Sequence, residues 1–258
     1  MLLLALAAVA SPSKLSSSAK VGSVLKLRGG VSISVSAGDA RTVAAGLMGL
    51  SSGIGYVWTD DMAKLYEFTD PVTPQTKLLT KMVFGINFAA AVLLLKPEFF
   101  VVALAGAPYS LADQAGAAFD MPRYPFFAWG ILPFVFEWAM ARGHLPKWAF
   151  GAFLMASGAS IIAAWDTACG LYQAKAKQLL TKQSECVGKF FASNQLAIGV
   201  YLVSQAIGNT AAQSFGYWSA VMIAANVKFI VSPGIVNPVG GYVWIALYAA
   251  AAGIDLMP

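Results

Sequence analysis

The chain has 258 residues, of which 58% are hydrophobic and 11% are charged. Soluble domains carry about 25% charged residues and roughly 45–50% apolar ones, so this composition excludes a soluble globular domain, a disordered chain and a coiled coil. Residues 1–38 carry four of the 17 basic residues and no acidic residue. The other 13 basic and 12 acidic residues nearly cancel, so most of the net charge of +5 comes from residues 1–38. We therefore predict an all-α polytopic membrane protein whose first partner is the lipid bilayer, with no surface for nucleic acid.

Residues 1–38 have the composition of a targeting leader. Leu2 to Ala10 is an apolar run that ends in small residues, like a secretory signal, and it is too short to span about 30 Å of hydrocarbon. Residues 11–38 contain nine Ser, four Lys or Arg and no acidic residue, which is typical of a transit peptide. This order resembles the bipartite leaders of algae with secondary plastids. The resemblance implies a cleaved leader and a plastid membrane; a plain secretory leader to an endomembrane or the plasma membrane is the alternative.

Eight stretches after the leader are apolar enough to form membrane helices. A span needs about 20 predominantly apolar residues, and Thr42 to Thr59 and Trp148 to Trp165 are uncharged runs of 18 residues each. The more polar segments 59–77 and 166–189 are predicted loops. The predicted helices cover 42–58, 78–95, 99–117, 126–141, 148–165, 190–207, 214–231 and 236–253.

The last four predicted helices repeat features of the first four. Matching residues recur in the same order at offsets of 106 to 108 positions, which favours a tandem duplication into halves at 39–146 and 147–258. Two similar hydropathy profiles are the alternative. Because each half has four helices, both halves cross the membrane in the same direction. The matched pairs include Leu47 with Leu154, Trp58 with Trp165, Asn87 with Asn194, Tyr109 with Tyr217 and Trp138 with Trp244.

The distribution of Lys and Arg predicts the orientation in the membrane. The side on which the first helix ends carries eight loop Lys or Arg residues, and the side on which it begins carries four. Since short loops rich in Lys and Arg stay on the cytoplasmic side, we expect the richer side to face the cytosol or the stroma.

A few polar residues inside the predicted helices are the candidates for function. A carboxylate in the membrane is costly unless it is paired or faces water, so Asp113 and Glu137 are candidates for a proton or solute path, with an interfacial position as the alternative. Asn87 and Asn194 match in the repeat, and Gln195 is adjacent. We predict that these amides form a polar site between the halves near the midplane, bordered by Glu137; hydrogen bonding between helices is the alternative.

Small residues on two predicted helices indicate close helix packing. Gly49 and Gly53 form a GxxxG pattern on the first helix, and Gly158 lies on the fifth. Such faces let helix backbones approach closely in a membrane, so these three glycines are predicted packing positions.

Patterns typical of enzymes and cofactor proteins are lacking in the sequence. His144 is the single histidine, and Cys169 and Cys186 do not have the spacing of metal ligands. We therefore expect no catalytic residue, metal or cofactor. The predicted function is a small-solute or ion transporter with its site between the halves. The alternative is a non-catalytic structural or assembly subunit of a plastid membrane complex, bound to other membrane proteins.

Overall fold

The computed structural model of the chain describes residues 23–26, 32–35, 37–61, 72–120, 122–172, 181–232 and 235–256. In these ranges the chain is helical apart from one antiparallel hairpin, and the all-α prediction is confirmed for the part that follows it. The hairpin is β1 (Ser23–Lys26) with β2 (Ser32–Val35). The helices are α2 (Ala37–Val57), α4 (Pro74–Leu95), the short 3-10 helix η1 (Pro97–Phe99), α5 (Phe100–Phe119), α6 (Tyr124–Ala141), α7 (Ala149–Ala163), α8 (Trp165–Tyr172), α10 (Lys182–Ala206), α11 (Ala211–Ile230) and α12 (Val239–Leu256).

Each predicted membrane helix overlaps an observed one. By length and composition, α4, α10 and α12 are able to cross a membrane, and α7 is apolar but shorter, with 15 residues. The structure therefore supports a helical protein associated with a membrane, and the number of spans remains a prediction.

The largest differences from the sequence prediction concern α10 and α8. Helix α10 begins at Lys182 rather than at residue 190, and α8 lies within a predicted loop. The first turns of α10 contain Lys182, Glu185 and Lys189, so a search for uncharged stretches misses them. Lys189 Nζ donates to Glu185 Oε1 at 2.6 Å one turn away, which suits an amphipathic helix end. The earlier start places Asn194 near the middle of α10.

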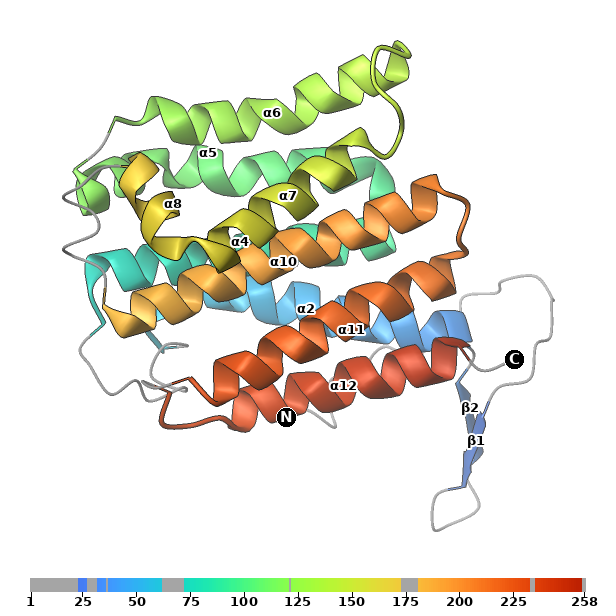
Figure 1. Ribbon diagram of the computed structural model, residues 1–258. Helices are drawn as coiled ribbons and strands as arrows, with labels where there is room; N and C mark the ends of the chain where they lie inside the picture. Colours follow the sequence, from blue (N-terminus) through green and yellow to red (C-terminus); the bar gives the residue numbers. More distant parts are fainter. Residues whose placement is uncertain are drawn as a thin grey trace.

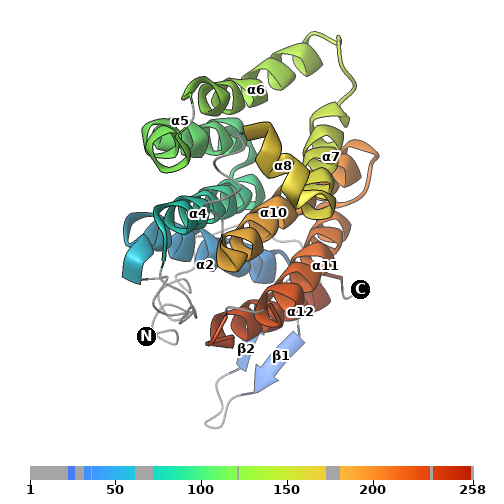
Figure 2. The same ribbon diagram turned by 60° about the vertical axis from the view of Figure 1, so that its left-hand side comes forward.

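Helices α4 and α10 form the centre of the bundle (Figures 1 and 2). Helix α4 packs against α2, α5 and α10, while α10 packs against α7, α11 and α4. Helix α6 lies outside α5, and α12 packs against both α11 and α2. Each central helix is therefore in contact with the other and with two outer neighbours, and this places the junction of α4 and α10 at the core.

Glycines bring α7 close to α10. A Cβ on Gly158 would lie 2.5 Å from the Ala192 carbonyl oxygen, and one on Gly151 would lie 2.9 Å from that of Gly199. Gly49 on α2 makes a looser approach, because its Cβ would be 3.2 Å from that of Ala91, and Gly53 has nothing within 4 Å. Gly158 and Gly49 thus lie at helix contacts. Gly53 makes no close contact within the bundle and lines an open groove between α2 and α4, so its role in helix packing remains a prediction.

The hairpin lies within the predicted leader 1–38, most of which is outside the described residues. Its register pairs Ser23 with Val35 and Lys26 with Ser32, and in Figure 1 it stands apart from the helices. We did not expect these strands, because the segment was interpreted from its composition. Cleavage of the leader remains a prediction.

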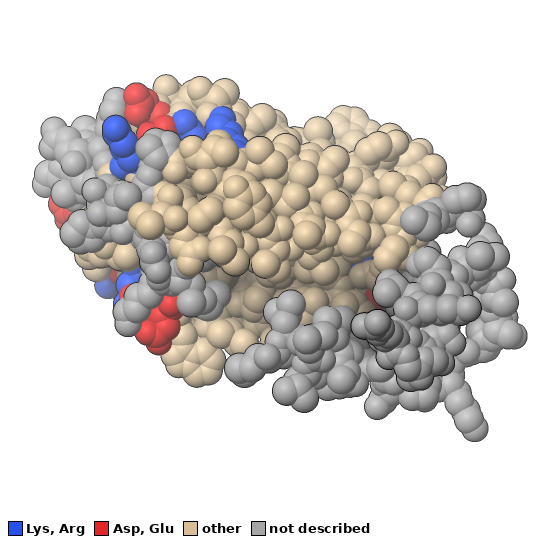
Figure 3. All heavy atoms as spheres, turned by 90° about the horizontal axis from the view of Figure 1, so that it is seen from below, with Lys and Arg blue, Asp and Glu red and all other residues tan. Residues whose placement is uncertain are grey.

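Charged side chains lie at both ends of the bundle, and exposed Lys96, Glu98, Arg142 and Lys147 are at the end where α4 ends. Figure 3 shows most visible Lys, Arg, Asp and Glu residues at the end where α4 and α10 begin, beside a wide uncharged surface. Several are paired there, including Lys77 with Asp60 at 2.6 Å and Arg123 with Asp113 at 2.7 Å. This separation of charged ends from an uncharged belt is the pattern of a protein that contacts hydrocarbon along its sides.

Candidate functional site

The contact between α4 and α10 is built from matching residues. Thr73 caps α4 by accepting a hydrogen bond from Thr76 N at 3.1 Å, and Thr181 caps α10 by accepting one from Ser184 N at 3.2 Å. The hydroxyls of Thr76 and Ser184, both fully buried, meet across the helix pair at 2.7 Å. Thr73 and Thr181 are 108 positions apart, as are Thr76 and Ser184. The two central helices therefore begin in the same way and touch at the same position.

A cavity of about 160 Å³ lies on one side of this pair, and we call it cavity A. Residues of α4, α5, α6, α7, α8 and α10 line it, among them Leu79, Trp129, Phe150 and Trp165. Gln195 of α10 is the carboxamide in this lining, and it is 4% exposed. Its Oε1 has no hydrogen-bond partner among the described residues. Since buried carbonyl oxygens are nearly always paired, this oxygen indicates a place for a ligand or water.

A cavity of about 80 Å³ lies on the other side of the pair, and we call it cavity B. Its lining comes from α2, α4, α10, α11 and α12 and includes Asn87, Asn226 and Trp244. The Oδ1 atom of Asn87 also lacks a partner among the described residues, whereas Asn226 Nδ2 donates to the Met222 carbonyl at 2.8 Å. Cavity B thus contains the same kind of unpaired amide oxygen in a more polar setting.

The central helices contribute matching positions to the two cavities. Each residue of α10 that lines one cavity has its counterpart in α4, 108 positions earlier, in the lining of the other, whereas Phe84 and Ile86 of α4 have no such counterpart. The position equivalent to Asn87 is therefore that of Gln195, which corrects the predicted match with Asn194. The pairs are Thr80 with Gly188, Val83 with Phe191, Asn87 with Gln195, Leu79 with Val187, and Met82 with Phe190.

Asn194 is buried but lines neither cavity. Its Nδ2 donates to the Phe190 carbonyl at 3.0 Å, one turn earlier in α10, and its Oδ1 has no partner in the described part of the chain. Asn194 and Gln195 are consecutive, so they point to different faces of the helix. The predicted meeting of Asn87 and Asn194 across the halves is replaced by two separate sites, one with Asn87 and one with Gln195.

The two predicted carboxylates lie outside both cavities. Asp113 has a side chain 73% exposed and pairs with Arg123, which corresponds to the interfacial alternative. Glu137 is exposed on the outer helix α6, and the prediction that it borders the amide site is wrong for these cavities. The neighbouring Phe136 packs against the core instead, and its ring makes a tilted contact with that of Phe150 of α7, with ring centres 5.1 Å apart.

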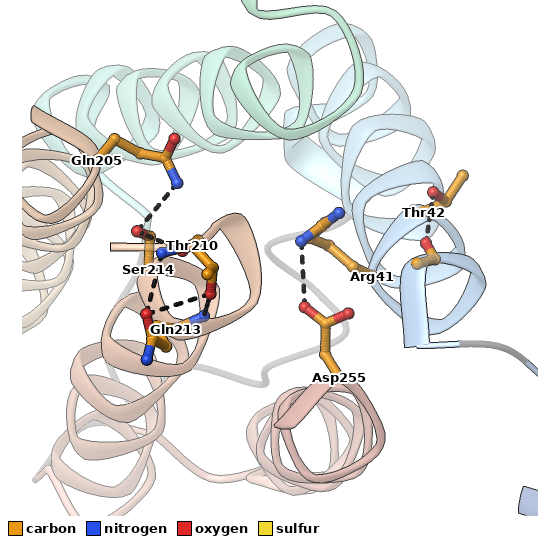
Figure 4. Close-up of polar contacts among 8 residues, drawn as sticks. Arg41, Thr42, Gln205, Thr210, Gln213, Ser214 and Asp255 are labelled. Carbon is orange, nitrogen blue, oxygen red and sulfur yellow. Dashed lines mark hydrogen bonds and ion pairs between the residues drawn. The ribbon is translucent and has the colours of Figure 1, made fainter. Parts of the chain in front are cut away.

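A buried ion pair that sequence reasoning missed joins the first and last helices of the bundle. Arg41 Nη1 of α2 lies 3.2 Å from Asp255 Oδ2 of α12, and the Asp255 side chain is 2% exposed (Figure 4). Nearby, Gln205 Nε2 donates to Ser214 Oγ at 3.0 Å between α10 and α11. Arg41 and Asp255 are 214 positions apart, so no local pattern could pair them.

The described residues contain no group of three or more His, Cys, Asp or Glu side chains that could hold a metal ion. Cys169 lines cavity A, and neither it nor Cys186 forms a disulfide there. Function must therefore be inferred from the two cavities and their amides. Protein-family models, curated proteins and solved structures gave no match to this chain.

Proposed function

We propose that this chain is an integral membrane protein that binds a small solute between two parallel four-helix halves and carries it across the bilayer. The observation that carries the proposal is the pair of cavities beside α4 and α10, each with a buried amide oxygen that lacks a partner. Both cavities are lined by helices of both predicted halves, which is where transporters with internal repeats bind their substrates.

Membrane insertion through all eight predicted helices is supported by the surface of the bundle. Large apolar side chains are exposed on the outer helices, for example Val102, Ile131, Phe134 and Val243. In water, contiguous apolar surface of this kind favours aggregation, whereas in a bilayer it faces lipid. With the Lys- and Arg-rich end in the cytosol or stroma, the termini of the helical body face the opposite compartment.

Duplication of a four-helix unit is supported by the order of packing. Helices α2, α4, α5 and α6 pack in sequence, as do α7, α10, α11 and α12. The hydrogen bond between Thr76 and Ser184 joins equivalent positions, which is what a two-fold axis between the halves requires. Transport would then follow from rocking of the halves about this contact, with the amides presenting the polar contacts to the solute.

The assembly alternative is favoured by a groove on the outer face of α2 and α4. The groove is lined by Gly46, Gly49 and Gly53 together with the exposed side chains of Leu50 and Phe88. Small residues beside apolar ones suit close packing of a helix from another membrane protein. A scaffold would use this groove and would not need the amides of the cavities.

Flux measurements separate the two functions. The full chain, reconstituted in liposomes, is tested by stopped-flow light scattering with urea, glycerol, erythritol, short diols and the ring compound cyclohexanediol. We expect faster permeation of at least one solute than in protein-free liposomes, and loss of the increase in Asn87→Leu and Gln195→Leu variants that remain folded. Unchanged flux in both variants, or no flux for any of these solutes, would favour the assembly role.

A further inference from the structure

We infer that cavity A binds a compact, largely apolar molecule about the size of benzene that carries one hydroxyl group, and that Gln195 recognises this hydroxyl. The inference deepens the proposed function, on which it rests for the role of the site, by naming the class of solute. Its binding step is independent of transport and is testable alone.

The volume of cavity A limits the size of its guest. The cavity measures about 160 Å³. An apolar protein cavity of about 150 Å³ stays dry and takes up benzene, while drug-sized ligands need roughly 300–1,000 Å³. Cavity A therefore fits one six-membered ring, and it is smaller than the sites that hold drug-sized ligands.

The lining selects a neutral guest with an apolar body. No Lys, Arg, Asp, Glu or His is among the described residues that line cavity A. The rings of Phe126, Trp129, Phe150, Trp165 and Phe191 contribute to its wall. Aromatic side chains favour offset or edge contacts with another ring, and a charged guest would lose its hydration without a counter-charge. The class is thus an uncharged ring compound.

Gln195 adds a requirement for a hydrogen-bond donor. Its Oε1 accepts no hydrogen bond from the described residues, and the residue is 96% buried. A guest hydroxyl in cavity A would pair with this carboxamide once its Oε1, which is fully buried, turns toward the cavity, whereas a methyl group in the same place would leave it unpaired. Leaving a buried acceptor unpaired weakens binding by roughly tenfold to a hundredfold. Cavity A should therefore prefer a hydroxylated ring to an apolar ring of the same shape.

Cavity A differs from cavity B in the features that suit this guest. Gly188 takes the place that Thr80 has in cavity B, and a Cβ on Gly188 would overlap the Trp165 ring. Glycine at this position lets Trp165 of α8 form part of the wall. Cavity B instead is lined by Ser51, Ser52 and two asparagines, a polar lining that suits water.

Phenol and toluene test the inference, because they differ by a hydroxyl in place of a methyl group. Each compound is titrated into the full chain in detergent, and binding is measured by calorimetry against a detergent blank. Its effect on the Tm of the protein is measured separately. We expect saturable phenol binding, with toluene at least about tenfold weaker. In Gln195→Leu the two probes should bind equally. The matched variant Asn87→Leu, at the equivalent position in cavity B, should keep the preference for phenol.

A second variant checks the location. Leu154→Trp fills cavity A from α7 and should abolish binding of both probes, with folding followed by helical circular dichroism. Absence of saturable phenol binding, a phenol preference that persists in Gln195→Leu, or binding that survives in Leu154→Trp would overturn the inference. Phenol binding as expected without solute flux would leave the site standing and reject transport. Solute flux without a preference for phenol would support transport and reject the proposed binding of a hydroxylated ring in cavity A.

Discussion

Cavities A and B occupy matching positions beside the central helix pair, and their outer walls are closed in different ways. Helices α2 and α12, which both line cavity B, are joined outside its lining by the partly buried pair Arg41 and Asp255. The equivalent helices beside cavity A, α6 and α7, meet through aromatic rings, such as Trp129 on Phe153 with centres 5.6 Å apart. Ion pairing and a polar lining accompany the smaller cavity, while ring packing accompanies the larger, apolar one. The same order of helices thus supports two chemically distinct sites.

The largest expected effect comes from breaking the ion pair that joins α2 and α12, two of the helices that line cavity B. Arg41→Ala leaves Asp255 buried without its partner, and loss of one member of a buried pair costs about 3–5 kcal/mol. Because the Arg41 side chain is 23% exposed, we expect the lower end, about 3 kcal/mol, in the free energy of unfolding measured with denaturant. The control is Arg142→Ala, an exposed arginine beside Trp138. Equal stabilities of the two variants would contradict a stabilising ion pair.

A second prediction compares the outer contacts of α7 and α2. Gly158→Val should destabilise the protein by about 1–3 kcal/mol, because its side chain meets the α10 backbone at Ala192 and Leu196. Gly53→Ala on α2 meets nothing within 4 Å and should stabilise the helix by roughly 0.5–1 kcal/mol. Unfolding in the same detergent measures both. Tolerance of Gly158→Val would show that α7 does not depend on this close approach.

The contact shared by both cavities should respond more weakly. Thr76→Val removes the hydrogen bond to Ser184, but Ser184 keeps the Thr181 hydroxyl at 3.3 Å. We expect a loss of about 1 kcal/mol, and a loss in the double variant with Ser184→Ala that is smaller than the sum of the two single losses, because both substitutions remove the same hydrogen bond. A double-mutant cycle of unfolding free energies measures the coupling. Strict additivity would mean that the two hydroxyls do not interact.

The smallest expected effect distinguishes the two amides. Gln195→Leu replaces an unpaired oxygen in an apolar lining and should stabilise the ligand-free protein by about 1 kcal/mol. Asn87 lies in cavity B with Ser52 and Asn226, where water can pair with its amide. Asn87→Leu should therefore leave the stability unchanged or lower it slightly. Thermal unfolding without added solute compares them. Identical shifts would remove the proposed chemical difference between the cavities.

The positions of the helices followed from the sequence, because long apolar stretches between charged residues mark them locally. The polar first turns of helices were missed for the same reason. Helix α10 begins with charged residues that a search for apolar stretches assigns to a loop, although Thr181 caps the helix just before them. The proposed repeat rests on matching residues in the sequence and in the caps of α4 and α10. The match of Asn87 was off by one residue, since small offsets cannot be resolved among so many similar apolar residues.

The sequence by itself determined a helical chain with few charges, the helix positions and the presence of amides within the helices. Only the tertiary structure decided that Gln195 lines cavity A while its neighbour Asn194 does not, because one residue along a helix turns a side chain by about 100°. It also decided that Glu137 faces outward and that Arg41 reaches Asp255. These relations depend on how distant helices pack against one another, and that packing has no local signature in the chain.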